Sequence, residues 1–123
     1  MTSKKQTSST SRIESIRYAI HGVQKFFREE PNARIHLLAT GIVCVAALYL
    51  RVSKTEQLLL IMVMGLVWIS EIFNTAIENI MDFVSTGRDE KIKTIKDLSA
   101  AAVLVSVIIA VATGLLVFIP KLF

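Results

Sequence analysis

The stretch LLLIMVMGLVWISEIFNTAIENIMD, residues 58–82, decides the fold because it joins one of the most apolar runs of the chain to a line of polar side chains. The members of that line are Glu71, Asn74, Glu78 and Asp82. Their spacing of i, i+3, i+7 and i+11 puts them on one face of a helix. Three acids and an amide at the end of a membrane span are costly unless a cation meets them. A divalent metal, or the magnesium of a nucleotide, is the natural candidate.

The composition indicates one membrane domain. The chain has 123 residues, of which 53% are hydrophobic, too many for an ordinary soluble domain of this size. Three apolar stretches account for the excess: residues 35–50, 58–80 and 98–119. The last has 22 residues and no charge, enough to cross a bilayer core of about 30 Å.

A soluble bundle of buried helices is the alternative, and the third stretch argues against it. A soluble helix needs a polar outer face, and residues 98–119 offer none. Ser99, Ser106 and Thr113 instead repeat every seven residues, beside several alanines and Gly114. Small residues in such a stripe are typical of a helix–helix seam in lipid.

The basic residues predict the orientation. Seven precede the first apolar stretch and four lie between the second and third, which makes eleven on one side. The other side has three, namely Arg51, Lys54 and Lys121. The positive-inside rule therefore puts the N-terminus and residues 85–97 in the cytoplasm. No basic groove with interleaved aromatic residues points to nucleic acid.

We expect an all-α membrane protein whose residues 11–123 form a single domain. Residues 1–10 are polar and predicted to be disordered. Apolar and basic residues alternate at helical spacing over 11–30, which predicts an amphipathic helix in the cytoplasmic interface, ended by Pro31. The predicted transmembrane helices cover residues 34–50, 58–83 and 97–119.

The depth of the acids divides them into two groups. A helix that enters the bilayer at residue 58 has risen about 20 Å at Glu71 and about 30 Å at Glu78. Glu71 therefore lies inside the cytoplasmic half of the bilayer, while Glu78 and Asp82 lie at or beyond the interface. The depth of Glu71 suits contact with a lipid headgroup, and the depth of Glu78 and Asp82 suits contact with a water-soluble nucleotide. Lys96, at the start of the third span, shares the depth of the shallower pair and suits a phosphate or those acids.

At these residues the sequence resembles the prokaryotic diacylglycerol kinase family, which includes the undecaprenol kinases. The strongest part is Glu71-x-x-Asn74-Thr75-Ala76-Ile77-Glu78-x-x-x-Asp82, followed by Lys96-Asp97 at the expected distance. Upstream, Glu30, Asn32, Arg34 and His36 are similar to the family's approach to its first span. The resemblance covers nearly all of the chain from about Arg12 onward.

The resemblance implies a homotrimer in which each chain supplies a surface helix and three transmembrane helices, with active sites shared between neighbouring chains. It implies transfer of the γ-phosphate of ATP, with Mg²⁺, to the hydroxyl of a membrane lipid alcohol. No G-x-x-x-x-G-K-[ST] motif occurs, in agreement with a family that has no P-loop.

The resemblance also implies residue roles. Glu30 and Glu78 match positions that bind the magnesium–nucleotide. Glu71 matches the proton acceptor at the lipid hydroxyl, and Asn74 would orient Glu71 or the phosphate. Positions that match other nucleotide contacts are Arg12, Tyr18, Gly87, Arg88, Asp89, Lys96 and Asp97. Supporting positions are Asp82, Arg34, His36 and Ser99.

The acceptor lipid stays open between undecaprenol and diacylglycerol. His36 stands where enterobacterial diacylglycerol kinases carry an acid and Gram-positive undecaprenol kinases tend to have histidine, which favours undecaprenol. A helix-end hydrogen bond is the structural alternative for His36. The alternative function is an ion or proton relay along the acids. A structural assembly subunit is a third hypothesis, but it leaves the acidic line unexplained.

Overall fold

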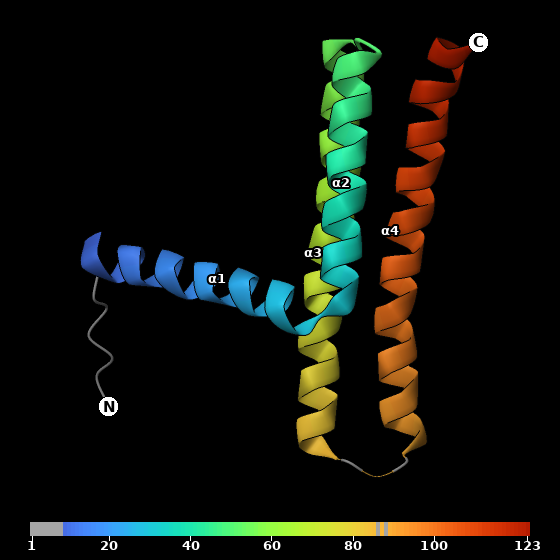
Figure 1. Cartoon of the computed structure of the whole chain (residues 1–123). Coiled ribbons are helices and arrows are strands. Elements are labelled where there is room, and N and C mark those ends of the chain that lie inside the picture. The colour runs from blue at the N-terminus through green and yellow to red at the C-terminus, as the bar shows by residue number, and fades with distance from the viewer. Residues whose placement is uncertain (1–8, 86, 88) are drawn as a thin grey trace.

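The computed structural model describes residues 9–85, 87 and 89–123, and this part of the chain forms four α-helices without strands. The helices are α1 (Ser9–Glu29), α2 (Pro31–Tyr49), α3 (Lys54–Val84) and α4 (Glu90–Leu122). Helices α2, α3 and α4 stand side by side, and α1 lies across their long axis (Figure 1). The predicted all-α fold with three membrane-length apolar helices is confirmed. Most of the predicted disordered tail lies outside the described residues.

Pro31 makes the corner between α1 and α2. It occupies the first turn of α2, where its missing N–H costs nothing, and Glu30 precedes it in an extended conformation. The Glu30 N–H still bonds to the Phe26 carbonyl, so α1 closes tightly before the chain turns. Helix α1 therefore ends where the sequence predicted, although it begins at Ser9, two residues earlier than expected.

The connection between α2 and α3 is a short turn with caps on both helices. Arg51 has a φ of 52°, and the Val52 N–H bonds to the Ala47 carbonyl, which is the Schellman arrangement at a helix C-terminus. Ser53 then caps α3 in a reciprocal capping box with Glu56. Glu56 also forms an ion pair with Lys121, so the turn is tied to the far end of α4.

The seam between α3 and α4 is held by hydroxyl groups, as the serine spacing predicted. Ser99 donates to Asn74 Oδ1 over 2.8 Å, and the Ser106 and Ser70 hydroxyls lie 2.8 Å apart. Ser99 and Ser106 are both buried. Thr113 continues the stripe in sequence, but its hydroxyl bonds to the Ile109 carbonyl of its own helix. Among the described residues, the hydroxyl bonds across this seam therefore lie in the half of α4 nearer its start, and the far end is held by the Glu56–Lys121 ion pair.

The single chain exposes far more surface than a soluble protein of its mass. Its accessible surface is 9,935 Å², whereas a compact 13.7 kDa monomer exposes about 6,600 Å². Large apolar side chains are exposed along all three long helices, for example Leu38 at 67% and Leu116 at 79%. Helices α2, α3 and α4 are each long and apolar enough to cross a membrane. The soluble-bundle alternative is therefore wrong.

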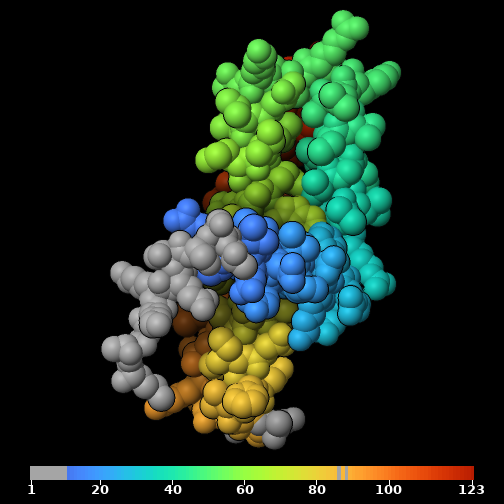
Figure 2. Space-filling model, turned by 90° about the vertical axis from the view of Figure 1, so that its left-hand side faces the viewer, coloured from blue at the N-terminus to red at the C-terminus, as the bar shows by residue number. Residues whose placement is uncertain are grey.

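The helix lengths differ in a way that positions the polar residues. Helix α2, with 19 residues, rises about 28 Å, close to the thickness of a bilayer core. Helices α3 and α4 rise about 46 and 50 Å. They continue past the α1–α2 corner toward the α3–α4 connection, as Figures 1 and 2 show. A bilayer placed over α2 therefore leaves the ends of α3 and α4 at that connection outside the hydrocarbon.

Candidate functional site

Among the side chains that the structure describes, Glu71 is the one acidic or basic residue that is buried. Its residue exposure is 6%, and its Oε1 lies 2.7 Å from Nε2 of His36 on α2. His36 lies in the second turn of α2, so this pair sits just inside the level of the α1–α2 corner. The structure thus gives His36 a side-chain partner on another helix instead of the helix-end bond considered as its structural alternative.

Trp68 anchors the helices around this pair. Its Nε1–H donates to the Thr40 hydroxyl over 3.0 Å, and that hydroxyl donates to the His36 carbonyl over 2.7 Å. The Trp68 ring also meets the His36 ring edge-on, with centroids 6.2 Å apart. Phe26 and Phe27 of α1 pack on the same indole at 6.3 and 5.2 Å. Helices α1, α2 and α3 therefore meet at Trp68, one turn from Glu71.

Asn74 faces α4 rather than the glutamate one turn before it. Its Oδ1 accepts a hydrogen bond from Ser99, and no bond to Glu71 occurs in the described part of the chain. The predicted supporting residue Ser99 thus holds the predicted residue Asn74. The role of Asn74 in orienting Glu71 has no contact to support it in the single chain, and the phosphate alternative stays a prediction.

Two ion pairs mark the end of the α3–α4 hairpin. Lys96 Nζ lies 2.5 Å from Asp82 Oδ1 across the two helices. Lys93 pairs with Asp97 within α4. The sequence predicted either a phosphate or the acids on α3 as the partner of Lys96, and the structure shows one of those acids, Asp82.

Four of the predicted nucleotide residues line one cavity of about 570 Å³ at this end: Gly87, Asp89, Lys96 and Asp97. Glu90, Ile92 and Lys93 complete its lining. Asp89 is also the N-cap of α4, where its carboxylate accepts the Lys91 N–H over 2.8 Å. The cavity therefore places two lysines and the start of a helix beside three acids, and each lysine is paired with an aspartate, so a phosphate would have to displace an aspartate from a lysine. Arg88 lies outside the described residues.

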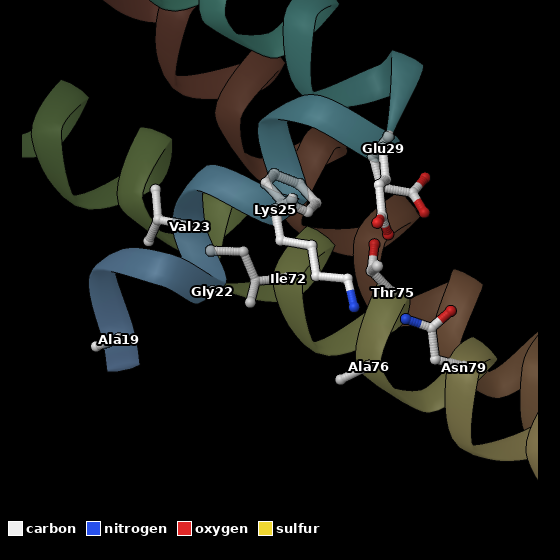
Figure 3. A pocket seen from close by; sticks show the side chains of 11 residues that line it. Ala19, Gly22, Val23, Lys25, Glu29, Ile72, Thr75, Ala76 and Asn79 are labelled. Carbon is white, nitrogen blue, oxygen red and sulfur yellow. The ribbon is translucent and has the colours of Figure 1, made fainter. Parts of the chain in front are cut away.

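A second cavity, of about 470 Å³, lies between α1 and α3. Glu30 and its neighbour Glu29 line it from the corner, and Thr75 and Asn79 line it from α3. Figure 3 shows Lys25 extending from α1 toward Thr75 and Asn79 on the facing helix. Carboxylate, hydroxyl and amide oxygens are the donors that magnesium prefers. The donor chemistry of this cavity therefore fits the predicted metal ligand Glu30.

Glu78, the other predicted metal ligand, is half-buried on α3 and does not line that cavity. Among the described residues, no group of three or more histidine, cysteine or acidic side chains is close enough to hold a metal. One chain therefore supplies fitting oxygen donors without completing a coordination shell.

Three predicted residues lie away from these contacts. Arg12 and Tyr18 are exposed on α1, Tyr18 at 69%. Arg34 is exposed on the first turn of α2. The single chain does not bring these side chains to Glu71 or Lys96.

Sequence reasoning missed the polar residues of the α1–α3 cavity and the partner of Glu71. Lys25, Glu29, Thr75 and Asn79 were not among the candidates. A usable signal existed on α3, because Ile72, Thr75, Ala76 and Asn79 follow the i, i+3, i+4, i+7 pattern of one helix face. The His36–Glu71 contact left no such signal, because it depends on how α2 and α3 are rotated against each other.

Comparisons with known proteins agree on one family. The profile of the family described as prokaryotic diacylglycerol kinase matches residues 17–118. The chain is 31% identical to an undecaprenol kinase of Bacillus subtilis, over 99% of this chain and 100% of that one. It is 34% identical to a diacylglycerol kinase of Escherichia coli, over 87% of this chain and 88% of that one. With a diacylglycerol kinase of Synechocystis the identity is 37%, over 89% of this chain and 63% of that one.

Proposed function

The chain belongs to the prokaryotic diacylglycerol kinase family, a family of membrane lipid kinases, and we propose that it transfers the γ-phosphate of ATP to the hydroxyl of undecaprenol or diacylglycerol. We favour undecaprenol. Its support is His36, together with similarity over the whole length of a relative named undecaprenol kinase. The products are undecaprenyl phosphate or phosphatidic acid, with ADP.

The burial of Glu71 just inside the α1–α2 corner is the observation that carries this proposal. Phosphoryl transfer needs a base near the attacking hydroxyl and cations around the phosphate oxygens. A carboxylate one to two helical turns below the interface lies at the depth that a lipid hydroxyl can reach. Glu71 accepts the hydroxyl proton as the oxygen attacks the γ-phosphorus.

The ends of α3 and α4 at their connection form the part of the active site that binds the nucleotide. Lys96 releases Asp82 and neutralises phosphate oxygens, and Asp97, Asp89 and Gly87 line the cavity where the nucleotide lies. These residues are outside the hydrocarbon when the bilayer covers α2, so ATP reaches them from water. Asn74 lies on α3 between Glu71 and the nucleotide residues. It contacts the phosphate as the phosphate is transferred from ATP to the lipid.

Magnesium is the proposed metal. Glu30 and Glu78 would hold it, with the oxygens of the α1–α3 cavity near Glu30. Bound there, it would neutralise charge on the phosphate oxygens. Glu30 sits at the corner before Pro31, so the position of its Cα is set by both α1 and α2, and its side chain makes no capping hydrogen bond.

We also propose a homotrimer with composite sites in the bacterial inner membrane. The long helices expose apolar faces on which neighbouring chains can pack, and the α1 side chains Arg12 and Tyr18 are exposed. In a trimer these α1 residues reach the nucleotide of a neighbouring chain. The positive-inside rule orients the N-terminus and the α3–α4 connection toward the cytoplasm.

The test is a kinase assay on the purified protein in bilayers, with γ-labelled ATP and either undecaprenol or diacylglycerol. We expect transfer to both lipids, with higher kcat/KM for undecaprenol. Glu78→Gln should fold normally and lose most activity. No labelled lipid from the folded wild type, together with proton flux in liposomes, would replace this proposal by the relay hypothesis.

A further inference from the structure

The buried carboxylate of Glu71 has two oxygens in different situations. Oε1 contacts His36 Nε2 at 2.7 Å, and no hydrogen bond to Oε2 occurs in the described part of the chain. A carboxylate with no second contact can rotate about its terminal bond, because that torsion is soft. The contact with His36 therefore determines which way the other oxygen points.

His36 is itself held on three sides. Its backbone carbonyl accepts the Thr40 hydroxyl, its ring meets the Trp68 ring edge-on, and its Nε2 meets Glu71. Thr40 is in turn fixed by the Trp68 N–H. The histidine side chain is 23% exposed and that of Glu71 8%, so both are well enclosed by α2 and α3. A ring held in this way is a rigid donor.

We propose that His36 is a positioning residue for phosphate transfer, whose Nε2–H fixes Oε1 of Glu71 and leaves Oε2 directed at the lipid hydroxyl. This inference rests on the proposed function, because it gives Glu71 the role of proton acceptor. Oε2 takes the hydroxyl proton while the lipid oxygen bonds to the γ-phosphorus and the bond from phosphorus to the β-phosphate oxygen breaks. His36 keeps its own proton throughout and contacts no substrate.

The test compares His36→Gln with His36→Leu. Glutamine can donate an N–H to Oε1 from a side chain of similar reach, whereas leucine cannot donate at all. Misplacing a reacting group by about 1 Å costs about 100-fold in rate. We expect His36→Leu to lower kcat about 100-fold with KM values for ATP and lipid within about threefold of wild type. His36→Gln should restore kcat to within about fivefold of wild type.

The other histidine provides a matched control. His21 is exposed on α1, so His21→Leu makes the same chemical change away from Glu71 and should leave kcat unchanged. Trp68 is the only tryptophan, and its ring contacts His36, so its emission reports whether each variant keeps the local packing. If the leucine variant does not fold, His36→Met makes the same comparison with a more adaptable apolar side chain.

The outcomes separate this inference from the proposed function. A wild-type protein that phosphorylates neither lipid alcohol overturns both. An active wild type with an equally active leucine variant overturns only the role of His36. An effect confined to KM also overturns the role of His36, because it would mean that His36 binds substrate. An equal loss of kcat in the glutamine and leucine variants overturns it too, because a hydrogen bond to Oε1 would then not be enough.

Discussion

Lys96 on α4 pairs with Asp82 on α3, 2.5 Å apart, and so closes the hairpin beside the cavity proposed for the nucleotide. The Asp82 side chain is 64% exposed and that of Lys96 36%. The ion pair is therefore solvent-exposed and adds well under 1 kcal/mol to the free energy of unfolding. A lysine held this loosely can exchange its carboxylate partner for a phosphate.

Replacing Lys96 with methionine should therefore harm nucleotide use more than folding. We expect kcat/KM for ATP to fall at least tenfold, about 1.4 kcal/mol, while the free energy of unfolding changes by less than about 1 kcal/mol. Steady-state kinetics and a denaturant titration in detergent measure the two quantities. Lys91→Met, an exposed change five residues earlier on α4, is the control. Equal ATP kinetics in both variants would remove Lys96 from the phosphate site.

Replacing Ser106 should test the seam between α3 and α4. Ser106 is 3% exposed and its hydroxyl lies 2.8 Å from that of Ser70. Ser106→Ala should cost about 0.6 kcal/mol, the average for such bonds in membranes. Ser106→Leu should cost about 1–3 kcal/mol, because a larger side chain at this buried position must displace the contact with Ser70. Unfolding measured in lipid or mild detergent gives both values.

Thr113→Ala is the control for the seam, since the Thr113 hydroxyl bonds only within α4 among the described residues. It should change the free energy of unfolding by less than about 0.5 kcal/mol. A leucine at position 106 that is tolerated as well as alanine would mean that α3 and α4 do not approach closely in the membrane.

Arg51→Gly should stabilise the protein. Arg51 holds a φ of 52°, a left-handed conformation that costs a non-glycine residue about 1 kcal/mol. Glycine adopts it freely but gains flexibility in the unfolded chain, so the net gain should be below about 1 kcal/mol. Arg51→Ala removes the same charge and keeps the strain, so it should give no gain. A melting comparison of the three proteins decides whether backbone strain or charge matters.

Removal of magnesium should abolish phosphate transfer, and Glu30→Gln should raise the Mg²⁺ concentration needed for half-maximal activity about tenfold. The reason is the loss of one carboxylate from an oxygen site that needs it for charge. Activity is followed while Mg²⁺ is titrated against EDTA-treated protein. Glu14→Gln, on the exposed part of α1, should leave the Mg²⁺ requirement unchanged. A requirement that is the same in both variants would move the metal away from Glu30.

Local signals allowed much of the fold to be predicted. Pro31 marks the corner because proline cannot continue a helix, and the serine spacing on α4 marks the seam because small residues allow close approach. Glu71 stood out because an acid inside a membrane helix is energetically costly and usually has a function, and the structure shows it buried. Each of these inferences depends on one helix only.

Relations between helices were beyond reach of the sequence. The contact of Glu71 with His36 depends on the rotation of α2, which no periodicity in that nearly uniform apolar helix reveals. The α1–α3 cavity depends on the direction in which α1 leaves the corner. Arg51 in a left-handed conformation could not be expected, because the residue type argues against it.

The unequal lengths of α2 and α3 make membrane thickness a variable of the reaction. With a bilayer placed over α2, we expect the boundary between hydrocarbon and water to cross α3 between Glu71 and Asp82, which lie eleven residues or about 16 Å apart along the axis. A bilayer thicker by one helical turn would draw the Lys96–Asp82 pair toward hydrocarbon, and a thinner one would wet Glu71. The lipids that surround the enzyme therefore help to set its rate, in addition to the one that it phosphorylates.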